Sequence, residues 1–232
     1  KYNQALMHFK LSRSNESQSF ILKCLYNLNK ENLFYEHLDF LIDHAEMNAL
    51  IGSFTLRAEI KYGVKKNNIF ANNPFDFIVK RDLTEQYDFE KVFVNTVKKI
   101  LNTDSVSYKS QGHLTNGQQT SGNIFSINNK SMIKIKRIIE SEVEKYKALF
   151  QSSEEGFLVN WPTKYKLFGW LVNMKSGGEL APHLHETGWI SGTAYINVPP
   201  KAKTNAGNLV LSLGEKQDET EMRKNVEKII DV

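Results

Sequence analysis

The sequence predicts an α+β protein in which helices come first and a β-sandwich or jelly-roll core follows. Up to about residue 60, apolar residues recur at helical spacing, whereas after residue 156 the pattern changes to aromatic and β-branched runs typical of short strands. The chain has 232 residues, which is enough to bury a substantial core. Its composition, 41% hydrophobic and 24% charged, is ordinary for a globular protein.

The N-terminal part is predicted to contain helices over 20–28, 33–45 and 50–60, separated by polar breaks. Antiparallel helices of this size resemble the end of a tetratricopeptide-like array. The alternative is a plain helical extension packed on the next domain. We expect residues 1–70 to form this helical segment, and a protein partner could bind to it. A second domain is expected over 71–232, because Asn72-Asn73-Pro74-Phe75 marks a boundary near residues 63–75.

The second domain is expected to open with helices and continue with strands. Apolar stripes predict helices at 88–102 and 129–150, with a polar, turn-rich stretch at 111–123 between them. Strands are predicted at 165–174, 189–198 and 208–213, and Ser176–Gly178 is predicted to be a turn. Residues 215–228 are charged and are expected to form an exposed insertion, after which 229–232 opens another strand.

Charge and cysteine content exclude several classes of protein. The net charge is +4, but the lysines are scattered without interleaved aromatic residues, so no nucleic-acid partner is expected. No apolar run is long enough to span a bilayer, and no membrane partner is expected. Cys24 is the only cysteine, which rules out an intrachain disulfide and fits a reducing, cytoplasmic compartment. Because residue 1 is Lys, we expect the true N-terminus to be missing.

His183-Leu-His185 is the pattern that points most directly to chemistry. On extended backbone, side chains at i and i+2 lie on the same face, so both imidazoles could reach one metal ion. Neutral imidazole suits Fe, Zn, Cu and Ni. Glu186 would project to the opposite face of a regular strand, but an irregular turn could change that, so the second ligand stays open between His185 and Glu186. The alternative is an ordinary surface histidine pair.

The run from Gly178 to Pro199, GELAPHLHETGWISGTAYINVP, resembles the 2-oxoglutarate–iron(II) oxygenase superfamily. It is closest to a bacterial and phage group that is often fused to tetratricopeptide repeats. In that group a histidine-rich segment precedes Trp, Ser-Gly and an aromatic strand that ends in Pro. Residues 207–212 resemble the group's next strand and 114–125 a second shared motif, so the resemblance spans about 72–232.

The resemblance implies a double-stranded β-helix (a jelly-roll or cupin-like fold) that uses Fe(II), 2-oxoglutarate and O₂ to hydroxylate a protein, a peptide or a small molecule. His183 matches the first metal ligand, and His185 stands where the family usually has a carboxylate. The third ligand and the basic residue that anchors 2-oxoglutarate are expected beyond Val232. The chain as it stands is therefore expected to be inactive, and His113 is not expected to be a ligand.

Secondary candidates follow from the same resemblance. Three residues are expected to contact the cosubstrate, although sheet packing would also account for them: Ser191, Tyr195 and Asn173. Three others are expected to line a substrate cleft, although turn chemistry would also account for them: Gln119, Thr120 and Asn123. Two other functions compete with the oxygenase. One is a non-catalytic, cupin-like metal- or ligand-binding module attached to a helical interaction domain. The other is a helical-repeat interaction protein in which the barrel is secondary.

Overall fold

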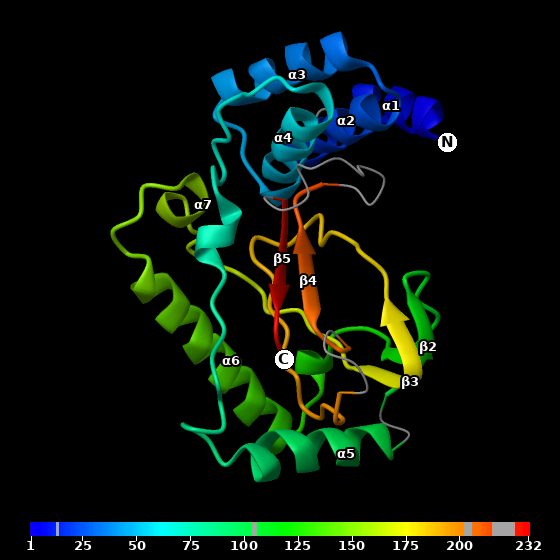
Figure 1. Cartoon of the computed structure of the whole chain (residues 1–232), viewed down its shortest axis with the longest axis vertical. Helices are drawn as coiled ribbons and strands as arrows, with labels where there is room; N and C mark the ends of the chain where they lie inside the picture. The colour runs from blue at the N-terminus through cyan, green and yellow to red at the C-terminus, as the bar shows by residue number, and fades with distance from the viewer. Residues whose placement is uncertain (13, 104–105, 202–205, 215–225) are drawn as a thin grey trace. The chain divides into compact units, whose positions relative to one another are not determined.

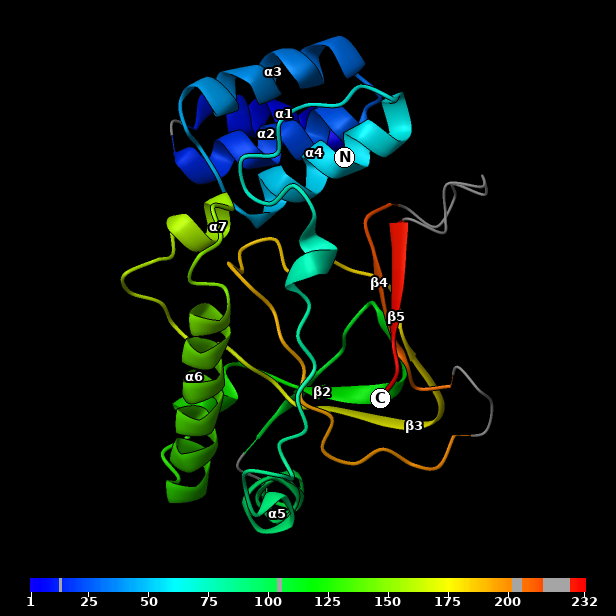
Figure 2. The same cartoon turned by 60° about the vertical axis from the view of Figure 1, so that its left-hand side comes forward.

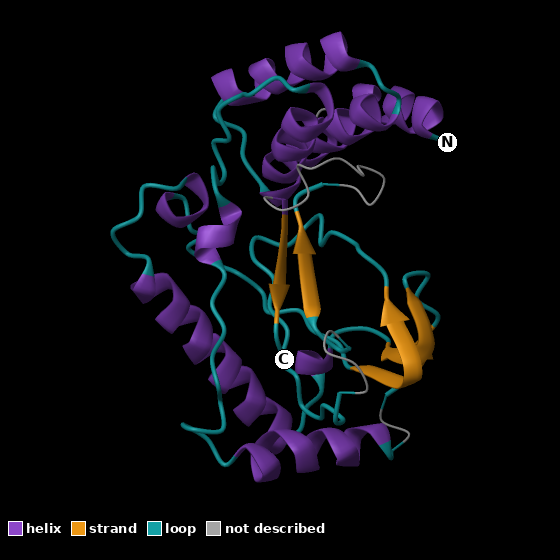
Figure 3. Cartoon of the chain, in the orientation of Figure 1, coloured by secondary structure: helices purple, strands orange, loops and turns teal. Residues whose placement is uncertain are grey.

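The computed structural model describes residues 1–12, 14–103, 106–201, 206–214 and 226–232. The chain divides into two compact units, neither of which is continuous in sequence. Unit 1 comprises Lys1–Ile78, Ser153–Trp161 and His185–Val232, and unit 2 comprises Val79–Ser152 and Pro162–Leu184. Helices and small antiparallel sheets are both present (Figure 3), so the prediction of an α+β protein with an N-terminal helical part is confirmed.

Unit 1 begins with helices α1 (Tyr2–Leu11), α2 (Asn15–Asn27), α3 (Glu31–Asp43) and α4 (Ala49–Tyr62), which pack together in Figure 1. Their ends follow the expected capping chemistry. The Asn48 side chain accepts a hydrogen bond from Ile51 N at the start of α4, and Gly63 ends the helix with φ 74°. The three predicted helices are confirmed as α2, α3 and α4, while α1 lies outside the predicted spans.

The core of the helical part is apolar and closely packed. Its central side chains come from α2, α3 and α4 and are each at most 2% exposed: Leu22, Phe34, Leu38, Leu41, Leu50, Phe54 and Ala58. All of these except Leu22 belong to the apolar positions that recur at helical spacing in the sequence. Burial of this common stripe, rather than intrinsic helix propensity, therefore holds the helices together.

The rest of unit 1 contains the 3₁₀ turn η1 (Pro74–Phe77), the short helix α7 (Gly156–Val159) and a hairpin of β4 (Leu209–Ser212) with β5 (Glu227–Ile230). The strand predicted at 208–213 is thus confirmed, and the one predicted to open near 229 is β5. The strand predicted at 189–198 is wrong, because the structure describes these residues as irregular. Most of the predicted insertion, 215–225, lies outside the described residues.

Unit 2 is built around the long helix α6 (Lys130–Leu149), which Figure 2 shows along its length. A π-helical turn, η2 (Glu90–Val94), leads directly into α5 (Asn95–Leu101), and a 3₁₀ turn, η3 (Ile124–Ser126), precedes α6. Both helices predicted here are confirmed. The buried apolar residues are shared between η2, α5, η3 and α6: Val92, Phe93, Ile100, Ile124, Met132, Ile135 and Ile138. In the part of the chain that the structure describes, no helix is both long and apolar enough to cross a membrane.

The sheet of unit 2 joins β1 (Tyr108–Lys109), β2 (Leu114–Thr120) and β3 (Val172–Leu180) in antiparallel order. β2 lies inside the stretch 111–123 that the sequence predicts to be polar and turn-rich. The turn signal at Asn116 is real, but it forms a bulge: Asn116 has φ 47°, and the register with β3 shifts between Thr115 and Gly117. Pairing with β3 stabilises a polar strand that has no alternating apolar pattern of its own.

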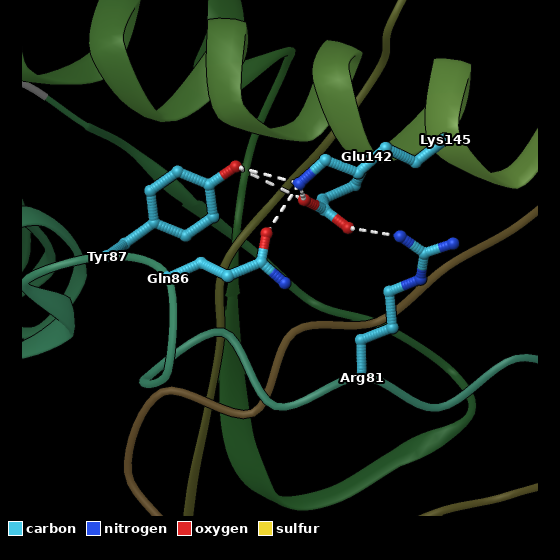
Figure 4. Close-up of polar contacts among 5 residues, drawn as sticks. All are labelled: Arg81, Gln86, Tyr87, Glu142 and Lys145. Atoms are coloured by element: carbon cyan, nitrogen blue, oxygen red, sulfur yellow. Dashed lines mark hydrogen bonds and ion pairs between the residues drawn. The ribbon is translucent and has the colours of Figure 1, made fainter.

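A polar cluster fastens the segment before η2 to α6 (Figure 4). The Glu142 carboxylate accepts hydrogen bonds from Tyr87 Oη at 3.2 Å and from Lys145 Nζ at 2.7 Å, and it pairs with Arg81 at 3.3 Å. Lys145 also donates to Gln86 Oε1 at 2.6 Å. Burial alone would raise the pKa of Glu142, but the hydrogen bonds from Lys145 and Tyr87 outweigh it and hold the pKa below its ordinary value.

Candidate functional site

The candidate metal-binding loop, defined here as Ala181–Trp189, begins as an extension of the β2–β3 pair. Leu114 pairs with Leu180 in the sheet, and one residue further on Ala181 N donates to His113 O at 2.7 Å. The antiparallel hydrogen bonding therefore continues past the end of β3. This hydrogen bond holds the backbone two residues before His183 against the residue that precedes β2.

His183 is exposed, and its ring is oriented by the backbone. Its Nδ1 lies 2.9 Å from Ala181 O. A carbonyl oxygen can only accept, so Nδ1 carries the hydrogen and the imidazole lone pair resides on Nε2, the nitrogen that a metal would bind. Metal-binding histidines usually have this arrangement, in which a backbone carbonyl fixes the tautomer and aims the second nitrogen.

His185 opens a tight turn rather than continuing an extended strand. Gly188 N donates to His185 O at 3.1 Å, which closes a four-residue turn over Glu186 and Thr187. The boundary between the units falls between Leu184 and His185, so His183 belongs to unit 2 and His185 to unit 1.

Glu186 is committed to an ion pair with the helical part of unit 1. Its Oε1 lies 2.5 Å from Lys23 Nζ of α2, and the two side chains are 29% and 27% exposed respectively. This contact bears on the choice left open by the sequence, since the carboxylate nearest to the histidines already has a cationic partner. The choice between His185 and Glu186 as the second ligand stays a prediction.

Trp189 anchors the far end of the loop. Its Nε1 donates to Phe157 O at 2.9 Å, and its ring meets Phe70 edge-on with centroids 5.2 Å apart. Phe70 in turn lies 5.6 Å from Phe157 between ring centroids. Trp189 is therefore a packing residue, with its polar nitrogen satisfied by the backbone.

The cosubstrate candidates lie on exposed backbone. Asn173 is exposed on β3 and is paired with Gln118 of β2. Ser191 and Tyr195 are exposed in the irregular stretch of unit 1. Partial burial of the Tyr195 side chain raises the pKa of its hydroxyl. Their role toward a cosubstrate stays a prediction.

The substrate candidates hold the backbone of residues 167–171. The fully buried Thr120 accepts a hydrogen bond from Leu171 N through its Oγ1 at 3.0 Å, and Thr120 N donates to Leu171 O at 3.0 Å. Asn123 accepts from Gly169 N at 3.0 Å and donates to Leu167 O at 3.0 Å. Gln119 is 2% exposed. The backbone at positions 167, 169 and 171 thus forms hydrogen bonds in the alternating pattern of an extended strand, partly with side chains. Contact of Gln119, Thr120 and Asn123 with a substrate stays a prediction.

His113 is the residue whose place the sequence did not reveal. Its ring stacks on that of His183, with centroids 5.4 Å apart and an interplanar angle of 12°. Because Ala181 lies opposite His113, His183 is the diagonal neighbour two residues further along the same face. Only the Leu114–Leu180 register brings the two histidines together, and no local sequence signal encodes that register.

Comparison with known proteins finds one family model that matches part of the chain. Residues 169–231 match the family model described as "Putative 2OG-Fe(II) oxygenase". The matched segment includes β3, the metal-binding loop, β4 and β5, whereas the motif at 114–125 lies outside it. The resemblance to the 2-oxoglutarate–iron(II) oxygenase superfamily is thereby confirmed over this segment. No curated protein and no solved structure matches the chain.

Proposed function

We propose that this protein is a 2-oxoglutarate- and Fe(II)-dependent dioxygenase that hydroxylates a protein, a peptide or a small molecule, with His183 and His185 as metal ligands. The observation that carries the proposal is the hydrogen bond from His183 Nδ1 to Ala181 O, because it lies inside the matched segment and makes Nε2 the nitrogen that would bind a metal.

The donor set fits the metal. Imidazole nitrogens suit Fe(II), and both proposed ligands are histidines. When bound, the metal would support oxidation of 2-oxoglutarate to succinate and CO₂, with one oxygen atom of O₂ entering a C–H bond of the substrate. In this proposal the chain contributes the ligands, and Ser191, Tyr195 and Asn173 orient the cosubstrate.

The fold belongs to the same proposal. We propose that β3, β4 and β5 are strands of a double-stranded β-helix, the fold that the superfamily implies. The antiparallel pairings of β2 with β3 and of β4 with β5 are compatible with it. The Fe(II), 2-oxoglutarate and O₂ requirements rest on the match over 169–231.

The test is binding of 2-oxoglutarate by the metal-loaded chain. Protein loaded with Fe(II) under reducing conditions should bind 2-oxoglutarate in a calorimetric titration. His183→Ala should abolish this binding, whereas His8→Ala, which changes an exposed histidine of α1, should leave it unchanged. Absence of 2-oxoglutarate binding in metal-loaded wild-type protein would contradict the proposal.

One observation favours a second candidate, a non-catalytic module that binds a structural metal. The Lys23–Glu186 ion pair leaves neutral imidazoles as the proposed ligands, and such ligands also suit zinc. Elemental analysis distinguishes the candidates. The second one predicts zinc that survives dialysis, is lost in His183→Ala, and is accompanied by no 2-oxoglutarate binding.

A further inference from the structure

One face of α6 carries three basic side chains around an exposed isoleucine. Lys130, Lys134 and Arg137 are exposed, and Ile133 is 40% exposed. The four residues are spaced at i, i+3, i+4 and i+7, so they share one side of the first two turns of the helix. This set is named the α6 basic face. The apolar side of α6 packs into the core of unit 2, so the basic face is not needed to hold the helix in place.

The cations of the α6 basic face are not paired with acidic groups of the chain. Ion pairs elsewhere on α6 join Lys136 to Glu140, and Glu142 to both Lys145 and Arg81. Among the residues that the structure describes, no ion pair or side-chain hydrogen bond is found for a cation of the basic face. Their charge is therefore available to a partner.

This concentration of positive charge disfavours the helix that carries it. Residues 130–137 include four basic and no acidic side chains. Lys130 and Lys134 are like charges at i and i+4, and no acidic residue in the first turn complements the helix dipole. Stability alone would favour Asp or Glu at such positions. A local arrangement that opposes stability is expected where a surface has a binding role.

The charge of unit 2 as a whole favours an acidic partner. Unit 2 contains 15 of the 30 basic residues of the chain but 9 of its 26 acidic residues. An excess of positive charge raises the rate at which a negatively charged partner encounters the surface, and salt screens this effect. Association through the α6 basic face should therefore weaken as the ionic strength rises.

Ile133 indicates which kind of acidic partner fits. Single-stranded nucleic acids are bound by cations together with stacking aromatic residues, and the basic face has no aromatic side chain. A lipid surface is bound by a broad apolar side, whereas this face offers one isoleucine. A peptide helix with an apolar residue between carboxylates could cover Ile133 and pair with the cations at once. The face is about 10 Å long, which matches two turns of such a helix.

We propose that the α6 basic face binds an acidic, amphipathic helical segment of a partner protein. An apolar residue of the partner covers Ile133, and its carboxylates pair with Lys130, Lys134 and Arg137. The surface lies wholly within unit 2. It needs neither a metal nor a cosubstrate, so the proposal goes beyond the proposed function and does not depend on it.

The probe is a fluorescein-labelled peptide of about 15 residues, built from Glu, Leu and Ala so that it can form an acidic amphipathic helix. Its binding to the full chain is followed by fluorescence anisotropy at low and at physiological salt. The matched probe has Gln in place of every Glu. The acidic peptide should bind, and the Gln peptide should bind at least about tenfold more weakly because it cannot pair with the cations.

Charge reversal separates the α6 basic face from the net charge of the chain. Lys134→Glu and Lys175→Glu change the net charge equally, but Lys175 is an exposed residue of β3. Lys134→Glu should weaken binding of the acidic peptide at least about tenfold, because it opposes like charges, whereas Lys175→Glu should change it less than about twofold. Lys134→Glu also removes the repulsion from Lys130, so it should unfold at or above the wild-type temperature. Ile133→Ser should weaken binding as well, because the apolar contact is lost.

Each outcome supports or overturns the proposal. An equal effect of Lys134→Glu and Lys175→Glu would show that net charge alone attracts the peptide, and would overturn it. Wild-type affinity in Ile133→Ser would do the same, because a purely electrostatic surface needs no isoleucine. Tighter binding of a single-stranded oligonucleotide or of phosphatidylserine vesicles than of the acidic peptide would assign the face to another class of partner. The assay contains no metal, so none of these results bears on the proposed dioxygenase.

Discussion

The hydroxyl of Thr120 offers a sharp test of how the backbone of residues 167–171 is held. Thr120 is fully buried, and its Oγ1 is the acceptor for Leu171 N at 3.0 Å. Thr120→Val keeps a β-branched side chain of similar size but removes this acceptor. Leaving a largely desolvated amide without a partner costs about 1–3 kcal/mol. An increase in local opening of about fivefold to more than a hundredfold is expected from that cost.

The assay is native-state hydrogen exchange at the Leu171 amide, followed by NMR. It reports the local bond directly and does not require the two units to unfold together. Thr120→Ser is the matched control, because it keeps the hydroxyl and should protect Leu171 far better than valine does. If Leu171 in Thr120→Val exchanged within about twofold of the wild-type rate, the side chain would not be the anchor inferred here.

Three further predictions concern charge, the metal-binding loop and the core. The depressed pKa of Glu142 means that its stabilisation is complete above its unfolded-state pKa of about 4.3 and is lost as the pH falls through the lower folded-state pKa. Wild type should therefore lose more stability than Glu142→Gln in urea titrations between about pH 5 and about pH 2, and parallel curves would contradict this. Lys23→Met removes the cationic partner of the Glu186 carboxylate, so the affinity of the chain for Co(II), which prefers the same donors as Fe(II), should rise in calorimetry. In the double variant Lys23→Met/Glu186→Gln the affinity should return to the wild-type value. An unchanged affinity in Lys23→Met would show that the ion pair does not restrain the loop. Phe34→Ala, at a side chain with no exposure, should cost about 3–5 kcal/mol of unfolding free energy in urea titrations followed by circular dichroism, and a cost below about 1 kcal/mol would contradict the core described above.

The helices could be predicted from the sequence because each one carries its own evidence. Leu38 and Leu41 of α3 and Met132, Ile135 and Ile138 of α6 are buried at the spacing that a helix imposes. The information lies within one stretch of chain, so a local pattern is sufficient. Helix positions therefore follow from the sequence, while the number of helices does not, as α1 shows.

The strands could be predicted only in part, because a strand depends on its partner. The aromatic and β-branched pattern of 189–198 reports the preference of these side chains, but no neighbouring edge pairs with it among the described residues. β2 shows the opposite case: Thr115 and Gln118 give no apolar alternation, yet β3 pairs with them. The same dependence on register explains why His183 could be predicted as a candidate ligand, whereas the position of His113 could not.

Thr120 and Asn123 hold the segment 165–171 through hydrogen bonds to its backbone, and these bonds do not involve the side chains of the segment. Tyr165 and Phe168 are 45% and 56% exposed, and neither takes part in the bonds at positions 167, 169 and 171. Gly169 is different, because a Cβ there would come within 2.4 Å of the Phe125 ring. The backbone bonds at 167, 169 and 171 therefore do not depend on the side chains at 165 and 168, while a larger residue at 169 would force the Phe125 ring to move. The segment therefore keeps its backbone path through bonds supplied by residues 120 and 123, whichever side chains stand at 165 and 168.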